Sequence, residues 1–130
     1  MKPGDHAEVS RSFSVEEIAE YIALSGHAIP DGVVPEPLIG ALFSYLLGVR
    51  LPGEGTMYLK QETRYLSEVL IDEPLIARVE ITRLRPEKYL VDLSTTCHGT
   101  NNRIIARGRA LVYVRDATLR SGGAGKSADF

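Results

Sequence analysis

The strongest hydrophobic pattern in the chain is an almost wholly apolar run from Leu38 to Leu47 that ends at Gly48. Pro37 directly precedes the run. A proline is well placed in the first turn of a helix, because its missing N–H would have no partner there. A helix that is apolar on nearly every side has to be buried on nearly every side. We therefore expect a central helix that the rest of the fold wraps, too short to span a bilayer.

Upstream of this run the pattern predicts a short strand and a second helix. Residues 7–13 alternate loosely between apolar and polar side chains, as in a strand. Ser14 and Glu17 then have the spacing of a capping box, and Gly26 is placed to end the helix they begin. The apolar stripe expected on that helix consists of Val15, Ile18, Ala19, Ile22 and Ala23.

Downstream, four segments have the length and alternation of strands: residues 56–66, 74–84, 89–97 and 103–114. The connections "RPEK" and "HGTNN" are short, and short connections join antiparallel neighbours. The chain thus predicts an antiparallel meander that follows an apolar helix.

These elements fit one α+β domain, in which a curved antiparallel sheet wraps a buried helix. This is the hotdog architecture, and we expect residues 1–115 to form it. Such a sheet usually leaves an edge that pairs with a second subunit, so we expect a homodimer. Residues 116–130 lose all periodicity and are rich in Gly, Ser and Ala, which predicts a flexible tail.

Composition narrows the setting and the partners. The 130 residues are 44% hydrophobic and 25% charged, which is ordinary for a soluble globular protein. The net charge of −2 gives no basic excess, so we expect neither a nucleic-acid nor a membrane partner. The single cysteine, Cys97, excludes an internal disulfide and fits the reducing cytoplasm, and we expect no metal site. No apolar stretch follows Lys2, so we expect no signal peptide.

Two long segments resemble one known family. Residues 4–26, "GDHAEVSRSFSVEEIAEYIALSG", resemble the opening of MaoC-like (R)-specific enoyl-CoA hydratases, and residues 42–114 resemble the remainder of these small enzymes. The resemblance rests on the order and spacing of the segments and covers most of the chain outside the tail. It implies a hotdog fold and the addition of water to a trans-2-enoyl thioester, or the reverse reaction.

The family's catalytic pair does not carry over. It lies in an Asp-x-Asn-Pro-x-His motif directly after a Ser-Gly. Here Ser25 and Gly26 are followed by His27, and the segment that normally leads to the buried helix is shortened. The His-Gly that opens the family's helix is replaced by Pro35 and Glu36. A short match of "HAIPDGVVPEPLI" to the loop of 3-hydroxyacyl-ACP dehydratases keeps His27, but the catalytic Glu of that family would fall at Ala41.

Three residues remain as candidates for acid–base chemistry, each with a structural alternative. His27 follows a helix C-terminus, which favours a charged imidazole, and is otherwise a surface histidine. Asp31 is close enough in sequence to approach His27, and otherwise serves a Pro-Asp-Gly turn. Glu36 begins the central helix, where a carboxylate is stabilised with or without a catalytic role.

For substrate binding, the resemblance implicates the first long strand and the start of the central helix. The backbone N–H groups of Glu36, Leu38 and Ile39 are candidates to bind a thioester oxygen. Candidates on the strand for contacts with the pocket, its entrance and the phosphates of the carrier arm are Tyr58, Lys60, Gln61 and Arg64. Solvated strand charges are the alternative for the basic residues.

Two classes of function therefore stay open. One is a hydratase or dehydratase with a rebuilt acid–base site, acting on acyl-CoA or acyl carrier protein thioesters, or a relative repurposed for thioester hydrolysis or conjugate addition. The other is a non-catalytic hotdog subunit that binds acyl thioesters or partners an active homologue. In both cases coenzyme A or phosphopantetheine belongs to the substrate, and we expect no separate cofactor.

Overall fold

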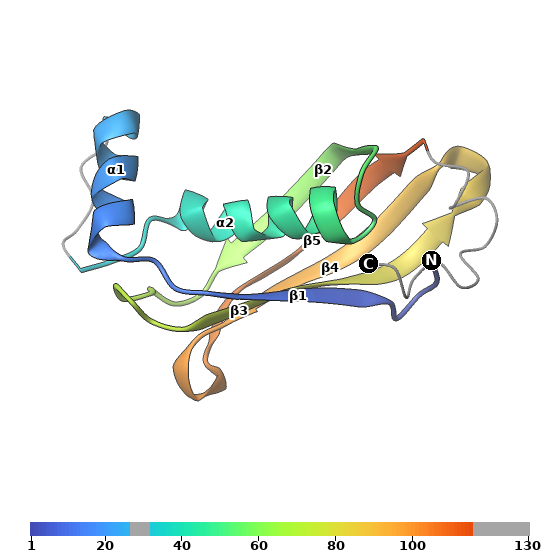
Figure 1. Ribbon diagram of the computed structural model, residues 1–130. Coiled ribbons are helices and arrows are strands. Elements are labelled where there is room, and N and C mark those ends of the chain that lie inside the picture. Colours follow the sequence, from blue (N-terminus) through green and yellow to red (C-terminus); the bar gives the residue numbers. More distant parts are fainter. Residues whose placement is uncertain (27–31, 116–130) are drawn as a thin grey trace.

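A computed structural model describes residues 1–26 and 32–115, which form a five-stranded antiparallel sheet with a helix lying along one face (Figure 1). The helices and strands, in chain order, are β1 (His6–Arg11), α1 (Val15–Ser25), α2 (Glu36–Tyr45), β2 (Thr56–Tyr65), β3 (Leu75–Arg85), β4 (Leu90–His98) and β5 (Ile104–Val114). Residues 116–130, where we expect a tail, lie outside the described part. The α+β hotdog arrangement predicted from the sequence is confirmed.

The strand order is β1-β3-β4-β5-β2, and every neighbouring pair is antiparallel. The strands β3, β4 and β5 alternate between buried and more exposed side chains, as expected for a sheet with one covered face. Their buried side chains meet Ile39, Phe43 and Leu46 from α2 and the turn after it. The core therefore lies between the sheet and one side of α2.

The local signals at the helix ends are confirmed. Ser14 Oγ accepts a hydrogen bond from the Glu17 N–H (3.2 Å), and Glu17 Oε1 accepts one from the Ser14 N–H (3.1 Å), so the capping box is complete. Gly26 ends α1 in the left-handed conformation (φ 71°), which costs a glycine little. The central helix ends earlier than expected, because a π-helical turn, Leu46–Arg50, follows Tyr45.

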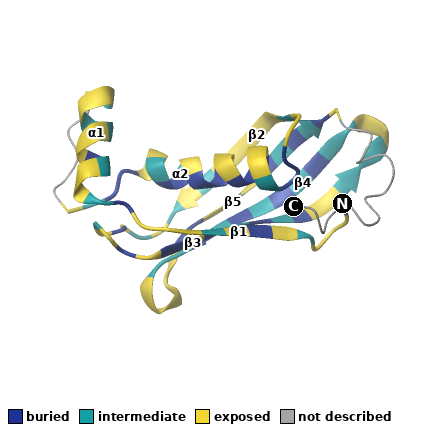
Figure 2. Cartoon of the chain, viewed as in Figure 1, coloured by how far each residue is buried: buried dark blue, intermediate teal, exposed yellow. Residues whose placement is uncertain are grey.

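The expectation that the central helix is buried on all sides is wrong for the single chain. The sheet covers only one side of α2, and Figure 2 shows the opposite side exposed. The exposed residues of α2 are Glu36, Pro37, Ala41, Ser44 and Tyr45. A five-stranded sheet is curved but not closed around the helix. One face of an apolar helix thus remains available for a ligand or for another subunit.

The apolar stripe expected on α1 is also mostly uncovered. Ile18 is buried and Ile22 is half-buried, whereas Val15, Ala19 and Ala23 are exposed. The reason is position, since α1 stands at one end of the sheet instead of lying across it (Figure 1). In the described part of the chain, neither helix is long and apolar enough to cross a membrane.

Candidate active site

The start of α2 leaves backbone donors without a capping side chain. Pro35 is the N-cap and has no side chain that can accept a hydrogen bond from the first turn. Pro37 lacks an N–H, and the Leu38 N–H donates to the Pro35 carbonyl (3.0 Å). For the Glu36 N–H, no acceptor occurs among the described residues. Of the donors proposed from the sequence, the Glu36 N–H is therefore available at the positive end of the helix dipole.

A pocket of about 460 Å³ opens beside this helix start, and we call it the N-terminal pocket. It lies between Tyr21 of α1, the first turn of α2 and residues 67–69. Glu36 lines it with an exposed side chain, and Ile39 lines it as a buried residue. The pocket thus combines an apolar wall with a carboxylate at a helix N-terminus.

A bulge in β2 decides which of its side chains face α2. Tyr58 pairs with Val112 and Lys60 pairs with Leu111, so Leu59 is the extra residue. Without the bulge, strict alternation would place Tyr58 on the same face as Lys60. With it, Tyr58 shares the α2-facing side with Gln61, because their partners on β5, Val112 and Ala110, are both buried.

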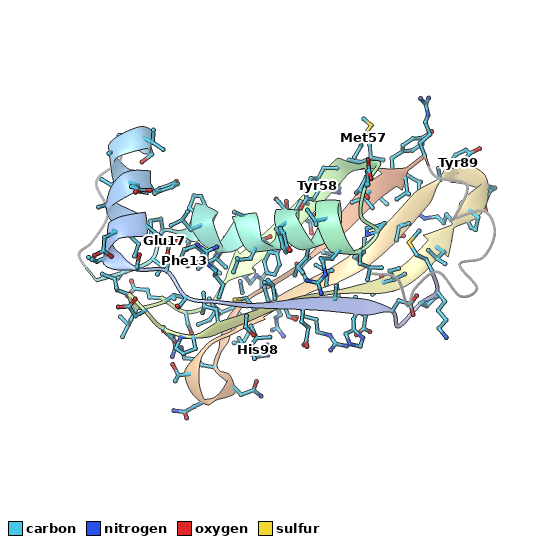
Figure 3. All side chains as sticks on the ribbon, viewed as in Figure 1. Phe13, Glu17, Met57, Tyr58, Tyr89 and His98 are labelled. Atoms are coloured by element: carbon cyan, nitrogen blue, oxygen red, sulfur yellow. The ribbon has the colours of Figure 1, made fainter. Side chains whose placement is uncertain are left out.

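The α2-facing side of β2 and the exposed side of α2 line a wide-open groove of about 490 Å³, which we call the α2–β2 groove. The residues lining it are Pro37, Gly40, Ala41 and Ser44 from α2 and Gln61, Thr63 and Tyr65 from β2. At its far end Tyr58 Oη donates to Ser44 Oγ at 3.3 Å, beside the C-terminal half of α2 (Figure 3). Since Pro37 also lines the N-terminal pocket, the groove and the pocket meet at the helix start.

Two phenols and a thiol in this region are held in their neutral forms. Burial raises the pKa of Tyr65, and the Glu36 carboxylate raises it further. Burial also raises the pKa of Tyr58, against the opposing effect of its bond to Ser44. Burial raises the pKa of the Cys97 thiol to about 11, and the Glu73 charge adds to that effect. At neutral pH these groups are hydrogen-bond donors or apolar surface, not nucleophiles.

The structure separates the strand candidates into two sets. Tyr58 and Gln61 face α2. Lys60 and Arg64 lie on the opposite face of the sheet, because they pair with Leu111 and Arg107 in the outward-facing rows. On that face Glu62 forms ion pairs with Lys60 (3.9 Å) and with Arg109 (3.2 Å).

The remaining candidates are divided in the same way. Glu36 and Ile39 line the N-terminal pocket, whereas half-buried Leu38 lines a different cavity between α1 and α2. His27 and Asp31 lie outside the described residues. The two described histidines, His6 and His98, line neither the groove nor the N-terminal pocket. Within residues 1–26 and 32–115, no cluster of His, Cys, Asp or Glu side chains is suited to bind a metal ion.

Three groove residues were not singled out from the sequence: Ser44, Thr63 and Tyr65. Ser44 is one of the few polar positions in the apolar helix, and that exception was a usable signal. Tyr65 gave no such signal in the sequence, because an aromatic residue at the end of a strand is ordinary. The side of the sheet on which Tyr65 lies depends on the bulge at Leu59.

Comparison with known proteins places this geometry in a family. No family model matches the chain. It is 31% identical to the (R)-specific enoyl-CoA hydratase of Aeromonas caviae, over 92% of this chain and 95% of that protein. It is 30% identical to the enzyme of the same name from Rhodospirillum rubrum, over 88% of each. A solved (R)-hydratase structure from A. caviae superposes with a TM-score of 0.83 at 30% identity, over 88% of this chain and 97% of that one.

These relationships extend over nearly the whole length of the relatives and agree in sequence and in fold. The resemblance found from residues 4–26 and 42–114 is therefore confirmed. The chain belongs to the family of (R)-specific enoyl-CoA hydratases.

Proposed function

We propose that this protein binds 2-enoyl or 3-hydroxyacyl thioesters of coenzyme A or acyl carrier protein in the α2–β2 groove and interconverts them by addition or loss of water. The observation that carries the proposal is the near full-length relationship to (R)-specific enoyl-CoA hydratases. The cavities support it, because the N-terminal pocket has a mostly apolar lining at a helix N-terminus and meets the more polar α2–β2 groove at Pro37, which suits an acyl chain attached to a polarised carbonyl. The single cysteine fits a cytoplasmic setting.

Glu36 supplies the acid–base group of this proposal among the described residues. Its carboxylate takes a proton from water as the water oxygen bonds to C3 of the enoyl thioester. The C2–C3 double-bond electrons then move toward the thioester oxygen and form an enolate. The protonated Glu36 returns the proton to C2, so one water is added and the carboxylate is regenerated. Loss of water follows the same steps in reverse.

His27 and Asp31 complete the set of acid–base candidates. In the sequence they lie between α1, which ends at Ser25, and Val33, which lines the N-terminal pocket. An imidazole and a carboxylate beside Glu36 would share its proton transfers.

A second candidate function is a non-catalytic subunit that binds acyl thioesters. It is favoured by the sequence after Ser25 and Gly26, which lacks the family's Asp-x-Asn-Pro-x-His motif. Such a subunit keeps the groove and the helix-start N–H but does not transfer a proton. The two functions share one binding site and differ in turnover.

We also propose that the protein is a homodimer joined through β2. This strand is an edge of the sheet, hydrogen-bonded to β5 on one side only. Met57 and Leu59 on it are 61% and 54% exposed, and unpaired edges with apolar side chains favour strand pairing. A partner at this edge would also cover the exposed side of α2 and close the α2–β2 groove.

The test is the hydration of trans-2-enoyl-CoA by the purified protein, followed by loss of enone absorbance, with binding measured separately by calorimetry. We expect turnover by the wild type and a loss of about 100-fold or more in Glu36→Gln, the size typical of a removed acid–base group. Turnover by His27→Ala and by Asp31→Asn tests the other two acid–base candidates. Glu87→Gln, at an exposed glutamate in the β3–β4 connection, is the matched control.

Binding without turnover by the wild type would favour the non-catalytic subunit. Turnover that survives in Glu36→Gln, His27→Ala and Asp31→Asn alike would contradict the acid–base assignment. Absence of both binding and turnover would contradict the proposed function.

A further inference from the structure

Tyr65 ends β2 directly beneath a gap in the side chains of α2. It pairs with buried Ala106 on β5, so it lies on the α2-facing side of the sheet. Its Oη lies 3.2 Å from the position that a Cβ of residue 40 would occupy. Because residue 40 is glycine, the phenol reaches the helix backbone closely and meets no side chain there.

The other phenol on the same side of β2, that of Tyr58, has a hydrogen-bond partner, whereas Tyr65 has none among the described residues. Tyr58 Oη donates to Ser44 Oγ, and Ser44 stands one helical turn after Gly40. Tyr65 reaches the same face of α2 one turn earlier, where Gly40 offers no acceptor. Within the described residues its hydroxyl has no hydrogen-bond partner, although tyrosine hydroxyls that are partly buried usually have one.

The surroundings of Tyr65 fit a donor that keeps its proton. The side chain is half-buried and lines the α2–β2 groove. Burial raises its pKa, and the Glu36 carboxylate and Cys97 add to the effect. Glu36 lies one turn before Gly40 on α2, and its N–H has no acceptor among the described residues. Two donors, a phenol from the sheet and an N–H from the helix, thus flank the region where the groove meets the N-terminal pocket.

We propose that Tyr65 Oη donates a hydrogen bond to the carbonyl oxygen of an acyl thioester, beside the helix-start N–H of Glu36 that the family resemblance already offers as a donor. This inference rests on the proposed function and adds Tyr65 as a second oxyanion donor of that site. The phenol donates a hydrogen bond and keeps its proton, and no covalent bond to Tyr65 forms or breaks. As negative charge moves onto the thioester oxygen, both hydrogen bonds strengthen, so the donors stabilise the enolate more than the substrate.

Tyr65→Phe tests this assignment with little risk to the fold, because it removes one oxygen that has no partner in the described chain. The first readout is the infrared stretch of crotonyl-CoA isotope-labelled at the thioester carbonyl and bound to the full-length protein. The wild type should lower this frequency relative to free crotonyl-CoA, and Tyr65→Phe should remove most of that shift. Tyr113→Phe is the matched control, since Tyr113 contacts Tyr89 and lies outside the groove.

The second readout is the hydration rate. Loss of one oxyanion donor lowers kcat by roughly 100-fold or more, with a smaller change in KM. Gly40→Ala is an independent variant, because its methyl group would lie 3.2 Å from Tyr65 Oη and push the hydroxyl by a few tenths of an ångström, so it should lower kcat and the carbonyl shift in the same direction as Tyr65→Phe but by less.

The outcomes separate this inference from the proposed function. Crotonyl-CoA binding by the wild type, with an unchanged carbonyl frequency and unchanged kcat in Tyr65→Phe, would overturn the inference alone. No crotonyl-CoA binding by the wild type would overturn the proposed function and the inference with it. A carbonyl shift that depends on Tyr65 supports the inference, with or without turnover.

Discussion

The carboxylate of Glu73 lies 2.7 Å from the hydroxyl of Thr100, and this contact joins the segment before β3 to the connection between β4 and β5. Glu73 is only 7% exposed. It also accepts hydrogen bonds from the Thr100 N–H (3.0 Å), the Leu70 N–H (3.1 Å) and Arg103 Nη2 (3.1 Å). Burial opposes ionisation of Glu73, but these bonds outweigh it and lower its pKa to about 2. The segment that borders the N-terminal pocket is thereby fixed to the connection between β4 and β5.

We predict that Glu73→Gln lowers the free energy of unfolding at neutral pH by about 2–3 kcal/mol, because an amide places donors where the buried site needs acceptors. Urea denaturation measures the change. Glu62→Gln is the control, since its exposed ion pairs should contribute less than about 1 kcal/mol. Equal losses in the two variants would contradict a special role for the Glu73 network.

The same carboxylate should make stability depend on pH. The folded pKa of about 2 is below the ordinary value of 4.5, so the contribution of Glu73 is complete above pH 4.5 and is lost as the pH falls toward 2. The loss can reach about 3 kcal/mol. Unfolding measured between pH 6 and pH 2 should therefore show a shallower fall in Glu73→Gln than in the wild type. Parallel curves would count against this origin of acid sensitivity.

Thr95 offers a stabilising substitution. Its hydroxyl is fully buried and is the buried side-chain polar atom without a partner among the described residues. Valine has nearly the same shape and no group that needs a hydrogen bond. We predict that Thr95→Val raises the free energy of unfolding by about 1 kcal/mol, visible as a higher Tm. A lower Tm would indicate that the hydroxyl is bonded in solution.

The capping box of α1 predicts a modest effect. Ser14→Ala removes the side-chain acceptor for the Glu17 N–H and should destabilise the protein by about 1 kcal/mol. Ser10→Ala, at an exposed residue of β1, is a suitable comparison. Helical content by circular dichroism, together with urea denaturation, distinguishes a lost helix start from a general loss of stability.

The β2 edge predicts the oligomeric state. The wild type should sediment as a dimer, and Met57→Lys combined with Leu59→Lys should give monomers, because charges on an edge strand oppose strand pairing. Ile76→Lys is the control. Ile76 is also an exposed apolar residue, but it lies on β3, which is paired with a strand on each side. A monomeric wild type, or a double variant that stays dimeric, would show that β2 is not the interface.

Much of the fold could be predicted because its signals are local. The capping box at Ser14 and Glu17 and the stop at Gly26 depend on residues a few positions apart. The meander of β3, β4 and β5 followed from alternation and short connections, and the apolar run marked the central helix, whereas the expectation that β2 begins the meander was wrong, because β2 pairs with β5 and β1 takes the place beside β3. The coverage of that helix was misjudged because it depends on how far the sheet curves, which no local pattern encodes.

The candidate site was harder to predict from the sequence, because it depends on contacts between segments that are far apart in the chain. The bulge at Leu59 places Tyr58 on the same face of the sheet as Gln61 and leaves Lys60 and Arg64 on the opposite face. No feature of the sequence at Leu59 predicts this bulge. The closeness of Tyr65 to Gly40 likewise joins a strand and a helix that are far apart in sequence. Glu36 could be singled out because the start of a helix is a local feature.

The most direct test of the account is a crystal structure of the protein with bound crotonyl-CoA or its hydration product. We predict that the acyl thioester lies in the α2–β2 groove, with its carbonyl oxygen within hydrogen-bond distance of the Glu36 N–H and Tyr65 Oη. A thioester bound elsewhere, such as against Arg64 and Arg107 on the opposite face of the sheet, would contradict the account.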